Sequence, residues 1–200
     1  MGQYSVKSGY RVGCSLGDDA SPSNMKPTKS WWKFLWCLKI PSKIKIFIWK
    51  ACHHWLPTLL SLTKRGIKVV SSYNECHSRP ESIYHAFWGC SYLKPIRRSL
   101  LFLEGLTNIE SLHFLDFMLI CKSRLKQVEM KSFCVILWRV WCNRNRKLHS
   151  LPQLPVDQIV DWSFDFLREF QEANSYTVPN TPQVIPRRSA PGRNLIKVNT

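Results

Sequence analysis

Apolar residues recur at helical spacing along most of this chain, and no segment shows a convincing strand pattern. The clearest stripe is Ile44, Phe47, Ile48, Ala51 and Trp55, which follow one another at positions i, i+3, i+4, i+7 and i+11. A brief alternation of polar and apolar residues falls inside the same stretch, but the longer stripe favours a helix. The sequence therefore predicts a mainly α-helical fold.

Further stripes predict two long helices over residues 109–125 and 128–146 and a final helix over 156–173. Shorter helices are expected near residues 81–90 and 91–103. These elements suggest a small helical domain around a knuckle-like loop, followed by two to three longer helices.

Helix boundaries are indicated by capping residues and by proline. Thr58 is expected to cap a short helix that Gly66 terminates. Residues 15–30 are expected to form a loop, with Ser30 as the cap of the helix that follows. Pro57 places the end of the preceding helix near His54.

The predicted helices and the prolines divide the chain into three parts. We expect a compact domain over residues 1–105, a helical connector over 106–174, and an extended tail over 175–200 that contains four prolines.

The charge is strongly basic, with 29 Lys and Arg against 13 Asp and Glu and a net charge of +16. Such an excess points to a polyanion, most simply RNA or DNA. Residues 25–50 contain seven lysines and no acid. The candidate phosphate contacts in this aromatic stretch are Lys33, Lys39, Lys43, Lys45 and Lys50. The alternative is a solvated helix face, and the interleaved aromatic residues are expected mainly in the core.

No run of apolar residues is long enough to span a membrane, and the N-terminus has no secretory signal. An intracellular location, nuclear or cytoplasmic, is therefore expected. In a reduced compartment the cysteines are core residues or metal ligands more often than disulfides. Core positions are expected for Cys14, Cys37, Cys52, Cys121, Cys134 and Cys142.

Cys76, His85 and Cys90 have the spacing C-x8-H-x4-C, which suits a zinc site. A thiolate before a turn and a His and Cys from a short helix can converge on one ion. Structural zinc normally takes four Cys or His ligands, and only three are evident here. The alternative that these are ordinary helix and loop residues stays open from spacing alone.

Four blocks in the correct order resemble the reverse-transcriptase zinc-binding domain of plant non-LTR (LINE-type) retrotransposon proteins. Residues 2–10 read GQYSVKSGY, and residues 32–49 contain KIPSKIKIFIW. Residues 56–67 resemble the family's L-P-T-x-x-x-L-x-x-R-G-[IV] block. Residues 76–90 resemble its Cys, Pro-Glu-Ser, His and Cys block.

The resemblance implies zinc bound by Cys76, His85 and Cys90, with one departure from the family pattern. Tyr73 stands where the family has its first cysteine, and tyrosine is a poor ligand for structural zinc. His77 is a weak substitute because adjacent residues rarely reach one ion without strain. A weakened or lost zinc site is therefore expected.

The second half also resembles the family's usual context. Residues 137–145 are similar to the helix between the zinc module and an RNase H-like domain, and residues 188–200 resemble the entrance of that domain. The chain stops before the first catalytic carboxylate, and no reverse-transcriptase palm precedes the module. A Trp pair at 138 and 141 is expected in helix packing, and Arg144 and Asn145 are expected to cap or link elements.

These features imply a non-catalytic, zinc-binding-type module associated with RNA or DNA. One alternative is a protein-interaction or spacer module that packs against reverse-transcriptase or RNase H domains. The other is a residual RNase H enzyme, which the missing carboxylates disfavour.

Overall fold

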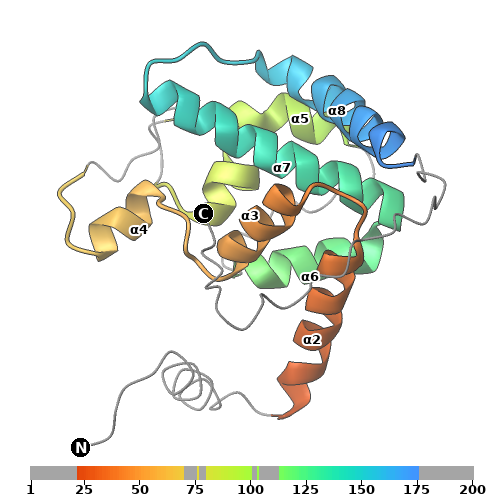
Figure 1. The fold of residues 1–200 in the computed structure, drawn as a ribbon. Coiled ribbons are helices and arrows are strands. Elements are labelled where there is room, and N and C mark those ends of the chain that lie inside the picture. The colour runs from red at the N-terminus through yellow and green to blue at the C-terminus, as the bar shows by residue number, and fades with distance from the viewer. Residues whose placement is uncertain (1–21, 70–75, 77–79, 101–102, 104–112, 176–200) are drawn as a thin grey trace, which may run out of the picture.

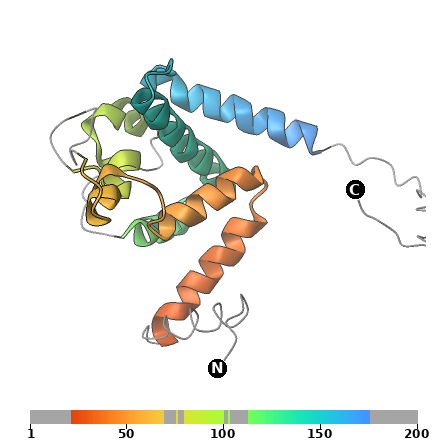
Figure 2. The same cartoon turned by 60° about the vertical axis from the view of Figure 1, so that its left-hand side comes forward.

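The computed structural model describes residues 22–69, 76, 80–100, 103 and 113–175. Within these ranges the chain is helical and contains no β-strand, as predicted (Figures 1 and 2). The α-helices are α2 (Pro22–Cys37), α3 (Ser42–Cys52), α4 (Leu59–Lys64), α5 (Lys94–Ser99), α6 (Phe114–Arg124), α7 (Gln127–Leu148) and α8 (Ile159–Ala173). The π-helix η1 (His85–Gly89) and the 3₁₀ turns η2 (Ser91–Leu93) and η4 (Val156–Gln158) complete the set.

Helix α7 is the central element of the fold. It packs against α8, α3 and η1, and Figure 1 shows it crossing the middle of the molecule. Its side chains are buried on several faces, including those of Phe133, Ile136 and Leu137. Trp141 is also buried, which confirms the packing role expected for it. By contrast, Figure 2 shows much of α2 extending away from the other helices.

Two predicted boundaries are wrong at the N-terminal side. Residues 22–30 belong to α2, so Ser30 lies inside a helix and does not cap one. Pro22 begins this helix, and its fixed φ and missing N–H suit a first turn. Helix α3 ends at Cys52, two residues before the expected end.

The ends of α3, α4 and α7 share one geometry. His54, Gly66 and Ser150 follow these helices with φ values of 55°, 80° and 54°. Each is followed by an amide that bonds back over five residues, as from Ile67 N to Leu62 O at 3.1 Å. The expected ends of α4 are confirmed, because Ser61 N donates to Thr58 Oγ1 at 3.2 Å and Gly66 follows the C-cap.

The cysteines divide by burial. Cys52, Cys121 and Cys134 lie in the core as predicted, and burial raises the pKa of Cys134 to about 12. These thiols therefore stay protonated and act as small apolar side chains. Cys37 is exposed, so its predicted core position is wrong, and Cys142 is half-buried. Cys37 is the last residue of α2, and its side chain does not lie on the buried face of that helix.

A buried ion pair joins the N-terminal half to α7. Arg144 Nε donates to Glu81 Oε1 at 2.7 Å, and its Nη2 donates to Glu81 Oε2. The side chain of Glu81 is fully buried. Glu81 also accepts Leu59 N on Oε2 at 2.7 Å and Leu60 N on its backbone oxygen at 3.3 Å. The pair thus fixes α4 and the segment after Pro80 against α7, and Arg144 links elements as expected.

Removing the cation of this pair should be costly. Arg144→Met leaves the Glu81 carboxylate buried without its counter-charge, and a loss of about 3–5 kcal/mol in the free energy of unfolding is expected. Arg168→Met is the matched control, because the Asp165–Arg168 pair is exposed and should contribute less than about 1 kcal/mol. Urea unfolding measures both, and equal effects of the two variants would contradict this view.

Candidate metal centre

The segment 81–90 folds so that the side chains of His85 and Cys90 come from one helical turn. Ser82 begins it, since His85 N donates to Ser82 Oγ at 3.1 Å. The helix then widens into η1, where Cys90 N donates to His85 O at 3.1 Å. This five-residue step is the hydrogen bond of a π-helix, a feature that is frequent at functional sites. It brings His85 and Cys90 to the two ends of one backbone hydrogen bond.

Aromatic packing anchors η1 in the core. Phe87 contacts Phe47 and Trp141 edge to face, with ring centroids 5.4 and 5.6 Å apart. Trp88 packs against Phe133 with centroids 5.5 Å apart. Both side chains are almost fully buried. The π-helix is therefore held by its apolar side chains, and these are independent of any metal.

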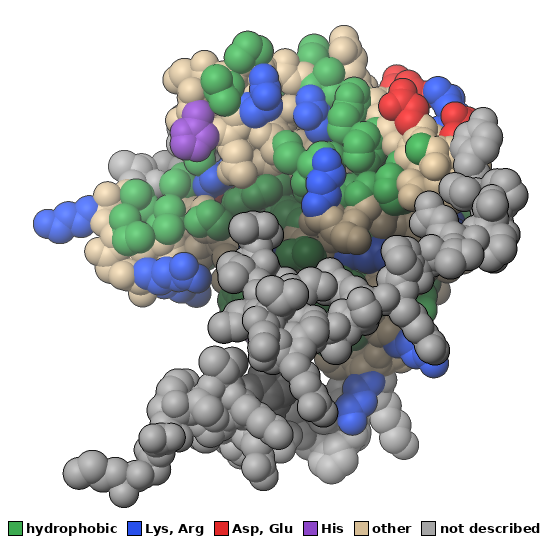
Figure 3. Space-filling view, in the orientation of Figure 1, with side chains coloured by type: hydrophobic (Ala, Val, Ile, Leu, Met, Phe, Trp, Pro, Cys, Tyr) green, Lys and Arg blue, Asp and Glu red, His purple; other side chains and the backbone are tan. Residues whose placement is uncertain are grey.

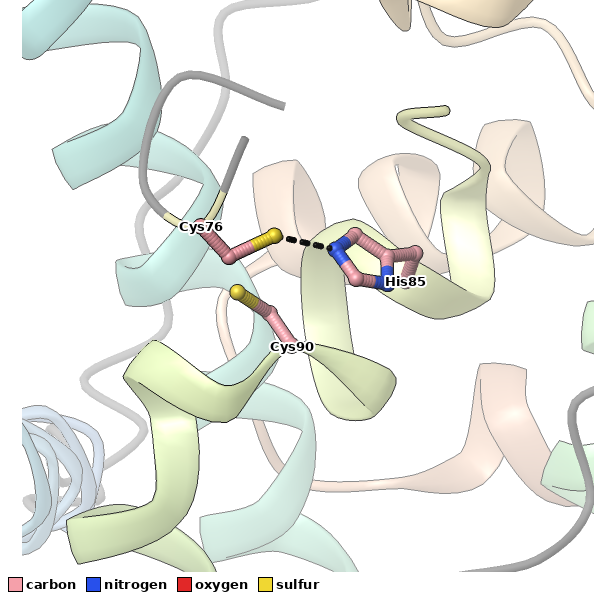
Figure 4. A group of neighbouring side chains, drawn as sticks. All are labelled: Cys76, His85 and Cys90. Atoms are coloured by element: carbon pink, nitrogen blue, oxygen red, sulfur yellow. Dashed lines mark hydrogen bonds between the residues drawn. The ribbon is translucent and has the colours of Figure 1, made fainter. Parts of the chain in front are cut away.

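Cys76, His85 and Cys90 converge in the structure (Figure 4). Their donor atoms all lie within 4.8 Å of one another, and Cys76 Sγ is 3.2 Å from His85 Nε2. His85 and Cys90 are buried, and Cys76 is half-buried. Figure 4 shows the three side chains pointing toward one another. The sequence prediction that these residues lie together is confirmed.

The donor set fits a zinc ion. Zn–S bonds of about 2.3 Å and Zn–N bonds of about 2.0–2.1 Å place tetrahedral ligands roughly 3.4–3.8 Å apart. The observed spacing needs only small movements to reach these values. The residues that would hold the ion are Cys76 and Cys90 through Sγ and His85 through Nε2. Tyr73 and His77 lie outside the described residues.

Two neighbours of the cluster, Arg97 and Gly89, were not predicted from the sequence. Arg97 Nη1 donates to Cys90 O at 2.7 Å and to Trp88 O, so it holds the end of η1. Burial lowers the pKa of Arg97, whereas Cys90 and Tyr84 raise it. Gly89 leaves room for the Tyr84 ring, because a Cβ at that position would lie 3.0 Å from Tyr84 Cε1. Gly89 could have been noticed in the sequence, because it directly precedes the candidate ligand Cys90.

The five predicted lysines do not form one group. Lys39 and Lys45 line a hollow of about 560 Å³ together with Lys131 of α7. Among the residues that the structure describes, none of those lining this hollow is acidic. Lys43 lies instead over the ring of Trp138, with Nζ 4.6 Å from the centroid. Lys33 and Lys50 are exposed on α2 and α3.

The aromatic residues of the same stretch divide between core and surface. Trp31 is fully buried, as expected for core. Trp36 and Trp55 are 46% and 54% exposed. Trp55 packs edge to face on Trp49, and His53 stacks on Trp32 with centroids 5.2 Å apart. The expected core role therefore holds for only part of this set.

Comparison with known families places the cluster in context. Residues 4–96 match the family model for zinc-binding in reverse transcriptase. This match covers just under half of the 200 residues and contains all three donors. No curated protein and no solved structure matches the chain. The resemblance to the reverse-transcriptase zinc-binding domain is thus supported over the region that carries the cluster.

The structure bears on the membrane prediction but not on the predictions for residues 2–10 and 188–200. No helix in the described part is long and apolar enough to cross a membrane. The block at residues 2–10 and the RNase H-like stretch at 188–200 lie outside the described residues, as does Cys14.

Gly89→Ala should disturb the cluster by contact alone. The added methyl meets the buried Tyr84 ring, so a loss of about 1–3 kcal/mol in stability and a weaker zinc affinity are expected. Gly66→Ala is the control, because nothing lies within 4 Å of its Cβ and only its positive φ opposes the change. That variant should lose about 1 kcal/mol and bind zinc normally. Thermal unfolding measures the stability of both variants, and zinc titration measures their zinc affinity.

Proposed function

We propose that this chain is a non-catalytic, nucleic-acid-associated module in which zinc has a structural role. The convergence of Cys76, His85 and Cys90 inside the matched region is the observation that carries the zinc assignment. Two thiolates and an imidazole are the ligands that structural zinc prefers. The ion would tie residue 76 to the π-helix, whose aromatic side chains already lie in the core.

The proposed partner is RNA or DNA, held through basic side chains. The hollow lined by Lys39, Lys45 and Lys131 supports this, since three cations converge there without an acid. The exposed Trp36 and Trp55 side chains are available for base stacking. On α8, Asp165 follows Asp161 by four positions and Glu172 follows Asp165 by seven. These three acids therefore lie on one face of the helix.

The second candidate is a protein-interaction or spacer module that packs against reverse-transcriptase or RNase H domains. Exposed large apolar side chains favour it, namely Trp36, Ile46, Trp55, Ile67, Val128, Leu148, Leu151 and Phe164. Concentration-dependent association of the isolated chain, with no binding to nucleic acid at low salt, would select this candidate.

The proposed origin is a LINE-type retrotransposon polyprotein of plants. The downstream resemblance to an RNase H-like domain entrance supports it, as does the motif order in residues 2–90. Nuclease or polymerase activity that persists through purification to homogeneity would contradict the non-catalytic assignment.

We expect zinc binding to be weak because Tyr73 occupies the position of a family cysteine. Tyr73→Cys should raise the zinc affinity by roughly tenfold or more, since it supplies a fourth ligand, which is also the third thiolate. Competition with a chromophoric chelator measures the affinity, and metal analysis gives the stoichiometry.

Two cysteine variants accompany that measurement, one that removes a ligand and one that serves as the control. Cys90→Ala should abolish zinc binding, and Cys37→Ala, which removes an exposed thiol outside the cluster, should leave it unchanged. One tightly held zinc per wild-type chain would contradict the weak site, and retention of zinc by Cys90→Ala would contradict the ligand set.

Nucleic-acid binding should depend on Lys39 and Lys131. The double variant Lys39→Gln/Lys131→Gln should bind single-stranded RNA or DNA more weakly, with a salt slope lower by about 1.4, or about 0.7 for each lost phosphate contact. Lys68→Gln/Lys94→Gln removes the same charge from exposed positions elsewhere and is the control. Fluorescence anisotropy between about 50 and 200 mM salt gives both slopes. Equal slopes for the two variants would reject this surface.

A further inference from the structure

A second hollow lies beside α4, away from the lysines discussed above. Its volume is about 370 Å³, which is within the range of small-ligand sites. Its floor is apolar and buried, formed by Ile83, Tyr84 and Phe114. Thr58, Ser61 and Ser82 contribute hydroxyl groups to the wall.

The ionisable side chains other than tyrosine that line this hollow are all bases. His54, Lys64, Arg65 and His113 line it, and none of its lining residues in the described part of the chain is acidic. Figure 3 shows basic side chains gathered over α4. Glu81 directly precedes the lining residue Ser82, and its carboxylate is paired with Arg144. The described lining therefore gives the hollow a basic character without an acidic side chain to oppose it.

Two imidazoles from distant parts of the chain meet at the rim. His54 Nε2 and His113 Nδ1 are 3.3 Å apart, although the residues are 59 positions apart in sequence. Burial lowers the pKa of His54, and the nearby His113, Lys64 and His53 lower it further. A bound anion would oppose that lowering at His54, and a ring N–H of either histidine can donate a hydrogen bond to it.

A metal ion is a poor occupant by comparison. Lys64 and Arg65 would repel a cation, and the lining supplies no carboxylate or thiol to complete a ligand set. The amides at the start of α4 do not contribute, because Glu81 and Thr58 already accept them. The binding groups are thus the basic side chains of the rim.

His54 occupies this place at a conformational cost. Its φ of 55° is the left-handed conformation that glycine adopts more readily, and Gly66 fills the equivalent position after α4. A glycine after α3 would make the helix end more stable. A histidine there is explained by its side chain, which lines the hollow and meets His113.

We propose that the hollow bounded by His54, Lys64, Arg65 and His113 binds a phosphate group of a nucleic-acid strand. This inference rests on the proposed function in one respect only, namely that the bound phosphate belongs to a nucleic acid. Arg65 and Lys64 supply the fixed charge, the two histidines supply donors, and the apolar floor accommodates part of the attached nucleoside. This site is separate from the Lys39, Lys45 and Lys131 hollow in its residues and its elements.

The direct test is a titration of the zinc-loaded full chain with inorganic phosphate, followed by the histidine ring resonances in NMR spectra. The signals of His54 and His113 should move together, and that of His149, which is exposed at the end of α7, should stay in place. Unmoved signals of His54 and His113 would overturn the proposal. Movement with excess Zn²⁺ but not with phosphate would overturn it as well, since the pair would then be a metal site.

Variants separate binding from folding. Lys64→Gln/Arg65→Gln should lose the phosphate response and weaken binding of a single-stranded oligonucleotide roughly tenfold. Lys94→Gln/Arg98→Gln removes the same charge from exposed positions of α5 and should keep both. Equal losses in the two variants would contradict the site.

His54→Gly gives the sharpest result, because structure and binding should change in opposite directions. The melting temperature should rise by about 2–4 °C, since glycine relieves the left-handed backbone, while the phosphate response is lost. A variant that still binds phosphate as the wild type does would overturn the role of His54.

Oligonucleotide binding distinguishes this site from the proposed function. Normal oligonucleotide affinity in Lys64→Gln/Arg65→Gln and His54→Gly would reject the site and leave the proposed function standing. A phosphate response without any oligonucleotide binding would reject nucleic acid as the carrier and the proposed function with it.

Discussion

The buried contact between Glu81 and Arg144 is the interaction on which the rest of the structure depends. One carboxylate receives the guanidinium of α7 and the first amide of α4, and it stands directly before the segment that forms the metal cluster. Such a pair need not add net stability over apolar side chains, because both charges lose their hydration. Its effect is on position, since it sets where residues 81–90 and α4 lie relative to α7. Both the cluster and the hollow beside α4 depend on that placement.

The cluster itself combines two independent sources of order. Phe87 and Trp88 hold the π-helix in the aromatic core whether or not zinc is bound. Zinc would add a tie to residue 76, which lies nine positions before His85 and outside the π-helix. The packing of η1 therefore does not depend on the metal affinity of the cluster.

The sequence predicted those features whose signals are local. The helical stripe of α3, the caps at Thr58 and Gly66, and the grouping of Cys76, His85 and Cys90 all arise from short spacings. Contacts over long distances had no such signal. Glu81 and Arg144 are 63 positions apart and His54 and His113 are 59 apart, so only the fold brings each pair together. The start of α2 was missed because proline and small polar residues suggest a loop as readily as a helix beginning.

The acidic residues have an uneven distribution whose consequence is kinetic. Five of the eight acids in the described part lie on η4 and α8, namely Asp157, Asp161, Asp165, Glu169 and Glu172. Figure 3 shows the acidic side chains on this face gathered at one end, over α8, whereas basic side chains are spread over the rest. The molecule therefore has a permanent electric dipole in addition to its net charge. In the field of a polyanion it would rotate before contact, so that the acid-bearing face of α8 points away, and encounters would be oriented before any specific bond forms.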